Sequence, residues 1–133
     1  YKADALAENL SEIAPYTKIQ AVTETITEEN FTELLKDADI VCEAFDNAES
    51  KAMLVNGVLE QLPRCYLVAA SGMAGMDTPN TIKTRKITNR FYLCGDETSD
   101  VTNTIGLVAP RVMLCAAHQA HTVLRILAGE YEV

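Results

Sequence analysis

Hydrophobic residues in this chain follow two patterns, helical spacing and short continuous apolar runs, and together these predict an α/β fold. Helical spacing predicts a helix that ends before Pro15, then helices over residues 28–37, 48–62 and 109–128. The apolar runs predict parallel strands over residues 40–45 and 65–70, and Ile19 and Val22 are the apolar members of a third predicted parallel strand over residues 18–23. From residue 76 the pattern alternates, which predicts antiparallel strands near residues 81–88 and 90–94.

The segment Ile40–Asn47 is the most informative part of the chain. Its β-branched, apolar run ends abruptly at Asp46 and Asn47, and a helical pattern follows at once. Asn47 is therefore expected to cap that helix. Ligands of open α/β sheets bind outside the carboxyl ends of the strands, which would place Asp46 beside a metal or a nucleotide. The alternative is that Asp46 only turns the chain.

Two further features leave both a functional and a structural interpretation open. The glycines of Ser71–Gly75, directly after an apolar strand, could let a ligand approach the backbone, but a plain turn is slightly favoured. Lys2 could act in a site or be a solvated terminal lysine.

Cys115, His118 and His121 stand three residues apart on one predicted helix. This spacing could point the two histidines at one metal ion. Their neighbours are apolar and no carboxylate is near in sequence, so packing within the fold is the favoured interpretation.

Composition narrows the class of protein. A chain of 133 residues with 48% apolar residues is expected to form one domain with a core of its own. The net charge of −8 argues against nucleic acid and against anionic membranes as partners. The four cysteines are widely spaced and form no Cys-x-x-Cys pair, so no zinc is expected and a reducing cytoplasm is the predicted location.

Several motifs, taken in order, resemble the ThiF/MoeB branch of the ubiquitin-activating superfamily. They are the helix start at Lys2, the strand Ile40–Asn47 ending in Asp-Asn, the strand and glycine turn Cys65–Gly75, the Gly-x-x-x-Pro helix start in Ile105–Pro110, and the helix end with Gln119-Ala120 and Leu127–Gly129. The resemblance covers nearly all of the chain.

This resemblance implies a Rossmann-like fold and an activity. Members adenylate the C-terminus of a ubiquitin-like sulfur carrier, and the likeness is greatest to ThiF-like enzymes of thiamine biosynthesis, whose carrier is ThiS-like. Lys2 falls on the lysine that contacts the ATP phosphates, and Asp46 on the aspartate that binds Mg-ATP. The resemblance therefore implies Lys2 and Asp46 as catalytic residues, Lys2, Asp46 and Asn47 as ATP-binding residues, and Asp46 as a Mg²⁺ ligand.

The chain also departs from the family pattern. The family's glycine-rich loop, ribose-binding acid and arginines belong before Lys2, so residues 1–133 are expected to be one domain that forms the C-terminal portion of such an enzyme, without its nucleotide-binding half. The position of the sulfur-handling cysteine of some members falls near Thr102, so covalent sulfur relay is not expected.

Two alternative functions and the oligomeric state remain open. A non-catalytic interaction or dimerisation module derived from the same fold is the main rival, and an NAD-dependent enzyme is a weaker one. In the family's sheet the two missing strands lie between the predicted strands 18–23 and 40–45. These strands would then either pair directly or lead to association, and a homodimer is the expected outcome.

Overall fold

A four-stranded mixed sheet forms the centre of the protein in the computed structural model, which describes residues 1–133. The strands are β1 (Ile40–Cys42), β2 (Tyr66–Ala70), β3 (Lys83–Thr88) and β4 (Phe91–Gly95), in the order β1-β2-β4-β3. β1, β2 and β4 run parallel, and β3 pairs antiparallel with β4 at the edge. The carboxyl ends of the three parallel strands therefore share one edge of the sheet.

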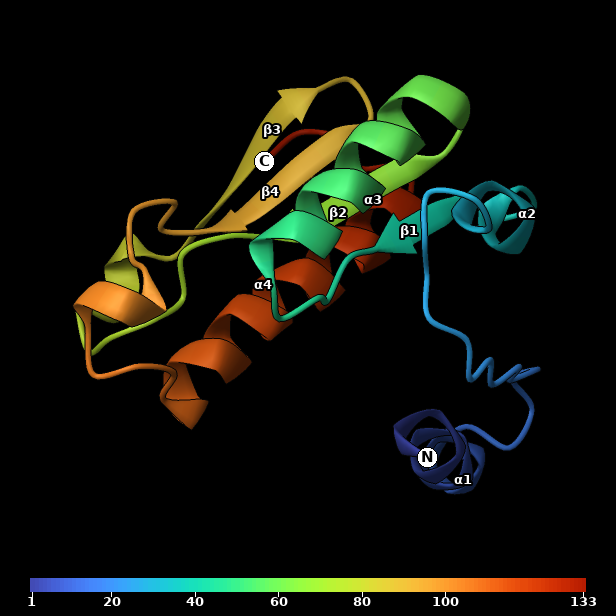
Figure 1. The fold of residues 1–133 in the computed structure, drawn as a ribbon, viewed down its shortest axis with the longest axis horizontal. Coiled ribbons are helices and arrows are strands. Elements are labelled where there is room, and N and C mark those ends of the chain that lie inside the picture. Colours follow the sequence, from blue (N-terminus) through green and yellow to red (C-terminus); the bar gives the residue numbers. More distant parts are fainter.

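Helices cover both faces of this sheet (Figure 1). The long helix α4 (Ala109–Leu127) packs on one face, while α3 (Ala48–Gln61) and the short α2 (Phe31–Leu35) lie on the other. Single 3-10 turns at Pro79–Thr81 and Val101–Asn103 interrupt the loops before β3 and α4. The result is a three-layer arrangement, as expected for parallel strands that are buried on both faces.

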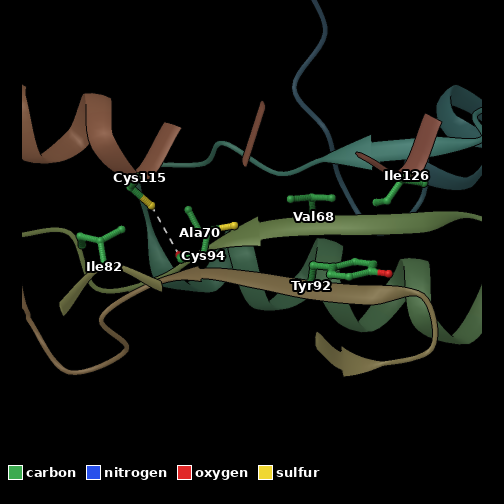
Figure 2. Packing of buried hydrophobic residues seen from close by; sticks show 7 residues of the cluster. All are labelled: Val68, Ala70, Ile82, Tyr92, Cys94, Cys115 and Ile126. Carbon is green, nitrogen blue, oxygen red and sulfur yellow. Dashed lines mark hydrogen bonds between the residues drawn. The ribbon is translucent and has the colours of Figure 1, made fainter. Parts of the chain in front are cut away.

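The alternation of β2 divides the core into two clusters. Val68 and Ala70 belong to the cluster between the sheet and α4, where Cys115 donates through its Sγ to the carbonyl of Cys94 at 3.4 Å (Figure 2). Leu67 belongs to the cluster on the α3 side. That cluster also explains Gly57 in the middle of α3, because a Cβ there would lie 2.5 Å from Cζ of Phe31.

Most of the predicted elements are present, but the predicted strand over residues 18–23 is wrong. These residues form no strand, and all of them except Ile19 are exposed. β1 pairs with β2 alone, so its other edge is open and the two segments do not pair directly. A strand exists only through its hydrogen-bonded neighbour, and no neighbour is available to residues 18–23.

Three other predictions need adjustment. The strand predicted over residues 90–94 is antiparallel to β3 but parallel to β2, because it inserts between them. The helix predicted over residues 28–37 is regular only over Phe31–Leu35 and begins after Asn30 instead of Thr27. The strand predicted over residues 40–45 ends at Cys42, and residues 43–47 form the turn into α3.

The first helix, α1 (Lys2–Ile13), is present but stands apart from the rest of the protein (Figure 1). None of its residues is buried, and Leu6 and Ile13 are 58% and 79% exposed. Its apolar stripe therefore has no counterpart in this chain.

Candidate functional site

Asp46 lies on the turn that connects β1 to α3, at the carboxyl edge of the parallel strands. The side chain of Asn47 accepts a hydrogen bond from the Ser50 amide at 2.8 Å, so the predicted cap of α3 is confirmed. Asp46 itself is exposed, and its carboxylate forms no hydrogen bond and no ion pair within the protein. It is thus a free carboxylate at the edge where ligands of α/β sheets bind.

Beneath this turn lies a buried ion pair that the sequence did not reveal. Glu43 is 0% exposed, and its Oε2 accepts from Nζ of Lys51 at 2.6 Å. The same carboxylate accepts from the amides of Phe45 at 2.6 Å and Ala70 at 3.3 Å. An acidic residue within an apolar strand, with a lysine in the first turn of the next helix, was the only available signal.

Gln119 connects α4 to the same turn. Its Nε2 donates to the carbonyl of Glu43 at 2.8 Å and to that of Val68 at 3.4 Å. Gln119 belongs to a motif of the resemblance, and in the structure it is buried and joins the long helix to the residue after β1 and to the middle of β2.

The Ser71-Gly72 turn packs against the loop that follows β4. Gly72 has φ +70°, and a Cβ there would lie 2.0 Å from Oδ1 of Asp96. Its carbonyl accepts from the Asp96 amide at 2.8 Å. The glycine is therefore required for contact with the protein's own backbone, which supports the structural interpretation of this motif.

A second buried ion pair, between Arg111 and Asp96, fixes the loops at the start of α4. The Arg111 guanidinium donates to three carbonyls, those of Ala74, Asp77 and Thr78, and also to Thr81 and to the Asp96 carboxylate. Burial alone would favour the neutral acid of Asp96. The amides of Ser99 and Thr98, together with Arg111, outweigh it and hold the pKa of Asp96 below its usual range.

The helix histidines and Cys115 do not share a metal site. Nδ1 of His118 lies 2.9 Å from Oγ1 of Thr84, whereas His121 is exposed. Burial raises the pKa of the Cys115 thiol to about 11, so it is neutral at physiological pH. No group of three or more His, Cys, Asp and Glu side chains is arranged to hold one metal ion.

The structure does not bring Lys2 to Asp46. Lys2 is exposed at the start of α1, which lies apart from the β1–α3 turn (Figure 1). Cavities of about 420 and 500 Å³ lie elsewhere, at the amino ends of the strands and beside the start of α4. Of the three predicted site residues, only Asp46 and Asn47 are neighbours, and their roles remain predictions.

The donor set at the turn fits one kind of metal binding. Mg²⁺ is usually held by one or two carboxylates, with water and substrate phosphates completing its shell. A single free carboxylate at Asp46 suits an ion that arrives with a phosphate, but it does not suit an ion held by protein ligands alone.

Comparison with known proteins decides the family. The whole chain, residues 1–133, matches the ThiF family. The chain belongs to the ThiF family. This ThiF-family chain is 29% identical over 133 residues to the sulfur carrier protein ThiS adenylyltransferase of Bacillus subtilis (strain 168), a match that covers 97% of the chain and 38% of that relative. The predicted family is thus confirmed.

Solved structures confirm the α/β fold of this ThiF-family chain. The E. coli tRNA N6-threonylcarbamoyladenosine dehydratase TcdA, solved in complex with ATP, superposes with a TM-score of 0.74 at 17% identity. The match covers 96% of this chain and 64% of TcdA. TcdA in complex with AMP gives a TM-score of 0.75, with 98% and 66% covered. The chain thus spans well under half of the Bacillus relative and under two thirds of TcdA.

No α-helix of the structure combines the length and the hydrophobicity that a membrane span requires.

Proposed function

We propose that this chain is the C-terminal portion of an ATP-dependent adenylyltransferase that activates the C-terminus of a ThiS-like sulfur carrier for thiamine biosynthesis. ThiF membership over all 133 residues and the likeness to a ThiS adenylyltransferase support the activity. The observation that supports a role of this chain in ATP binding is the free carboxylate of Asp46, on a hydrogen-bonded turn at the edge of the sheet where ligands bind.

The reaction asks for little covalent chemistry from the protein. A carboxylate oxygen of the carrier attacks the α-phosphorus of ATP. The bond between the α-phosphorus and the oxygen that bridges to the β-phosphate breaks, and pyrophosphate leaves. Catalysis therefore depends on positioning and on stabilising negative charge. Mg²⁺, when bound, would neutralise phosphate charge, and Asp46 would hold it. Lys2 would neutralise further phosphate charge, and Asn47 would keep the turn in place for the nucleotide.

A protein carrier suits this chain better than a nucleic acid does. TcdA shares the fold, and its name gives a tRNA nucleoside as its substrate, at 17% identity. The present chain carries a net charge of −8, and phosphate backbones bind mainly to basic surfaces. A small carrier with a basic surface is the partner that this charge favours.

The assembly and the location belong to the same proposal. β1 has an open edge, and Met113, Leu124 and Leu127 of α4 are 61–70% exposed. We propose that a homodimer in the reducing cytoplasm covers part of this surface. Light scattering of the purified protein at tens of micromolar is expected to give twice the monomer mass, and a clean monomer would contradict this assembly.

ATP–pyrophosphate exchange tests the activity in the longer protein that contains this chain, with a purified ThiS-like carrier. Asp46→Ala is expected to lower the exchange rate by about 10²-fold or more, because a metal-binding carboxylate contributes several kcal/mol to transition-state stabilisation. The fold is expected to be unaffected, since Asp46 is exposed.

Asp39→Ala is the matched control. Asp39 is an exposed aspartate just before β1, at the opposite end of the same strand. Its loss is expected to leave exchange unchanged. Near-normal exchange in Asp46→Ala would make Asp46 only a turn residue. Absence of exchange in the unaltered protein would favour the non-catalytic interaction module.

A further inference from the structure

We propose that Glu43 and Lys51 are positioning residues that hold the Asp46 turn in the geometry for binding the metal and nucleotide. This role rests on the proposed function and assigns a task to the buried ion pair beneath the site. Neither residue is available to a ligand as Asp46 is, because Glu43 is fully buried and the side chain of Lys51 is 24% exposed.

The burial of Glu43 is the first argument. A carboxylate removed from water is strongly disfavoured unless it is paired and hydrogen-bonded. Here it has three donors, which are Nζ of Lys51 and the amides of Phe45 and Ala70. Apolar residues could fill the same volume with no need for hydrogen-bond donors. The ion pair is therefore better explained by the backbone of the turn that it holds in place.

The hydrogen bonds of the turn show what is held. The Glu43 carboxylate binds the Phe45 amide, and the Phe45 side chain packs against the core cluster on the α3 side. On the other side of Asp46, Asn47 caps α3. The backbone is thus fixed on both sides of Asp46, while the Asp46 side chain points into solvent.

Lys51 joins this turn to the helix that follows it. Its amide donates to the Asn47 carbonyl at 3.2 Å, and its side chain returns to Glu43 at 2.6 Å. The carboxylate also reaches Ala70, the last residue of β2. The ion pair therefore ties β1, β2 and the start of α3 together directly under Asp46. Holding a ligand residue in one position removes an ordering cost from binding.

A purely structural role makes a different prediction from a positioning role, and the double variant Glu43→Gln with Lys51→Met separates them. This variant removes both charges together, so no lone buried charge remains, and the chain is expected to fold. Lys51→Arg keeps the ion pair. Glu33→Gln with Lys36→Met is the matched control, because it removes a Glu–Lys pair at 2.5 Å that lies on the surface of α2 and its cap.

Three measurements on the longer protein test the role. In the double variant we expect pyrophosphate exchange to fall by about 10–100-fold, as is typical when a residue that orients a metal ligand is lost. We expect half-maximal exchange to need more Mg²⁺. We also expect faster hydrogen exchange at the amides of Phe45 and Ala70, with the β2 amide of Val68 unchanged. Lys51→Arg is expected to retain most of the exchange rate, and the surface control to retain all of it.

The outcomes distinguish this role from the proposed function itself. A folded double variant with normal exchange, normal Mg²⁺ demand and unchanged amide exchange at Phe45 would overturn the positioning role. If the double variant does not fold, Lys51→Met alone decides: a folded Lys51→Met protein with a raised Mg²⁺ demand and faster amide exchange at Phe45 would support the positioning role, and unchanged values of both would overturn it. No exchange in the unaltered protein would contradict the proposed function, and the amide exchange at Phe45 would still decide whether the pair holds the turn.

Discussion

Helices α1 and α4 both repeat apolar residues at helical spacing, yet only α4 has a sheet to cover. α4 buries Cys115 and Ile126 against the strands and fixes itself through Arg111 and Gln119. α1 has a similar stripe of Leu6, Leu10 and Ile13, and none of its residues is buried. Amphipathic pattern therefore makes a helix, while the presence of a complementary face decides whether that helix contributes to the fold.

The same contrast separates the two predicted charged site residues. Asp46 lies on a turn held by a buried ion pair, a helix cap and the core. Lys2 lies on α1, a helix with no buried residue, so no packing contact fixes the position of Lys2. A side chain can serve in a site when its surroundings fix it, and in residues 1–133 the contacts that would do so surround Asp46 but not Lys2.

The contacts that fix α4 predict the largest effect. Arg111→Met leaves the Asp96 carboxylate buried without its cation and removes the donor of three carbonyls. Breaking a buried pair in this way is expected to lower the free energy of unfolding by about 3–5 kcal/mol, measured by urea denaturation.

Arg125→Met on the same helix is the control. Arg125 is partly exposed and lies 3.9 Å from Glu130, so the loss is expected to stay below about 1 kcal/mol. Equal losses in the two variants would mean that the Arg111 contacts do not hold α4 in place.

A smaller effect is expected from acidification. The pKa of Asp96 is lower in the folded protein than its usual value, so its contribution to stability is present above the unfolded pKa of about 3.9. This contribution is lost as the pH falls through the folded pKa. Between pH 5 and pH 2, Asp96→Asn is therefore expected to lose less stability than the unaltered chain, in unfolding curves taken at each pH. An identical pH dependence would show that Asp96 is not stabilised as a carboxylate.

Local patterns predicted the elements that depend on local signals. The helices around residues 48–62 and 109–128, the cap at Asn47 and the strand at 65–70 are all confirmed within a few residues. Residues 18–23 failed because a strand needs a neighbour, and the identity of that neighbour is not a local property. The direction of β4 depended on the path of residues 71–82, which no apolar pattern describes.

The candidate site divides in the same way. Asp46 and Asn47 could be found because the end of an apolar run marks the end of a strand. The ion pair of Glu43 and Lys51 could not be found in this way, because it forms only when the turn brings the residue after β1 close to α3. The pair of Asp96 and Arg111 joins the loop after β4 to the first turn of α4, fifteen residues further along the chain, and no sequence pattern predicts it.

Deletions at the two ends of the chain extend the comparison of α1 with the rest of the protein, and their expected effects on stability are the smallest. Deleting residues 130–133 removes the stacking of Tyr131 on Tyr66, with ring centroids 5.6 Å apart, and the 2.7 Å hydrogen bond from Tyr92 Oη to the Tyr131 carbonyl. A loss of about 1–2 kcal/mol in unfolding free energy is expected. Deleting residues 1–13 removes thirteen residues against four, and a complete helix, but no buried side chain.

The loss on deleting residues 1–13 is therefore expected to stay within about 0.5 kcal/mol, the usual range for surface changes. Urea denaturation of both truncated chains in the same buffer compares their free energies of unfolding. A larger loss at the N-terminal end than at the C-terminal end would mean that α1 packs on the sheet in solution. Lys2 would then be held close to the body that carries Asp46, and residues 1–133 would bring the two predicted site residues nearer together than the separate position of α1 implies.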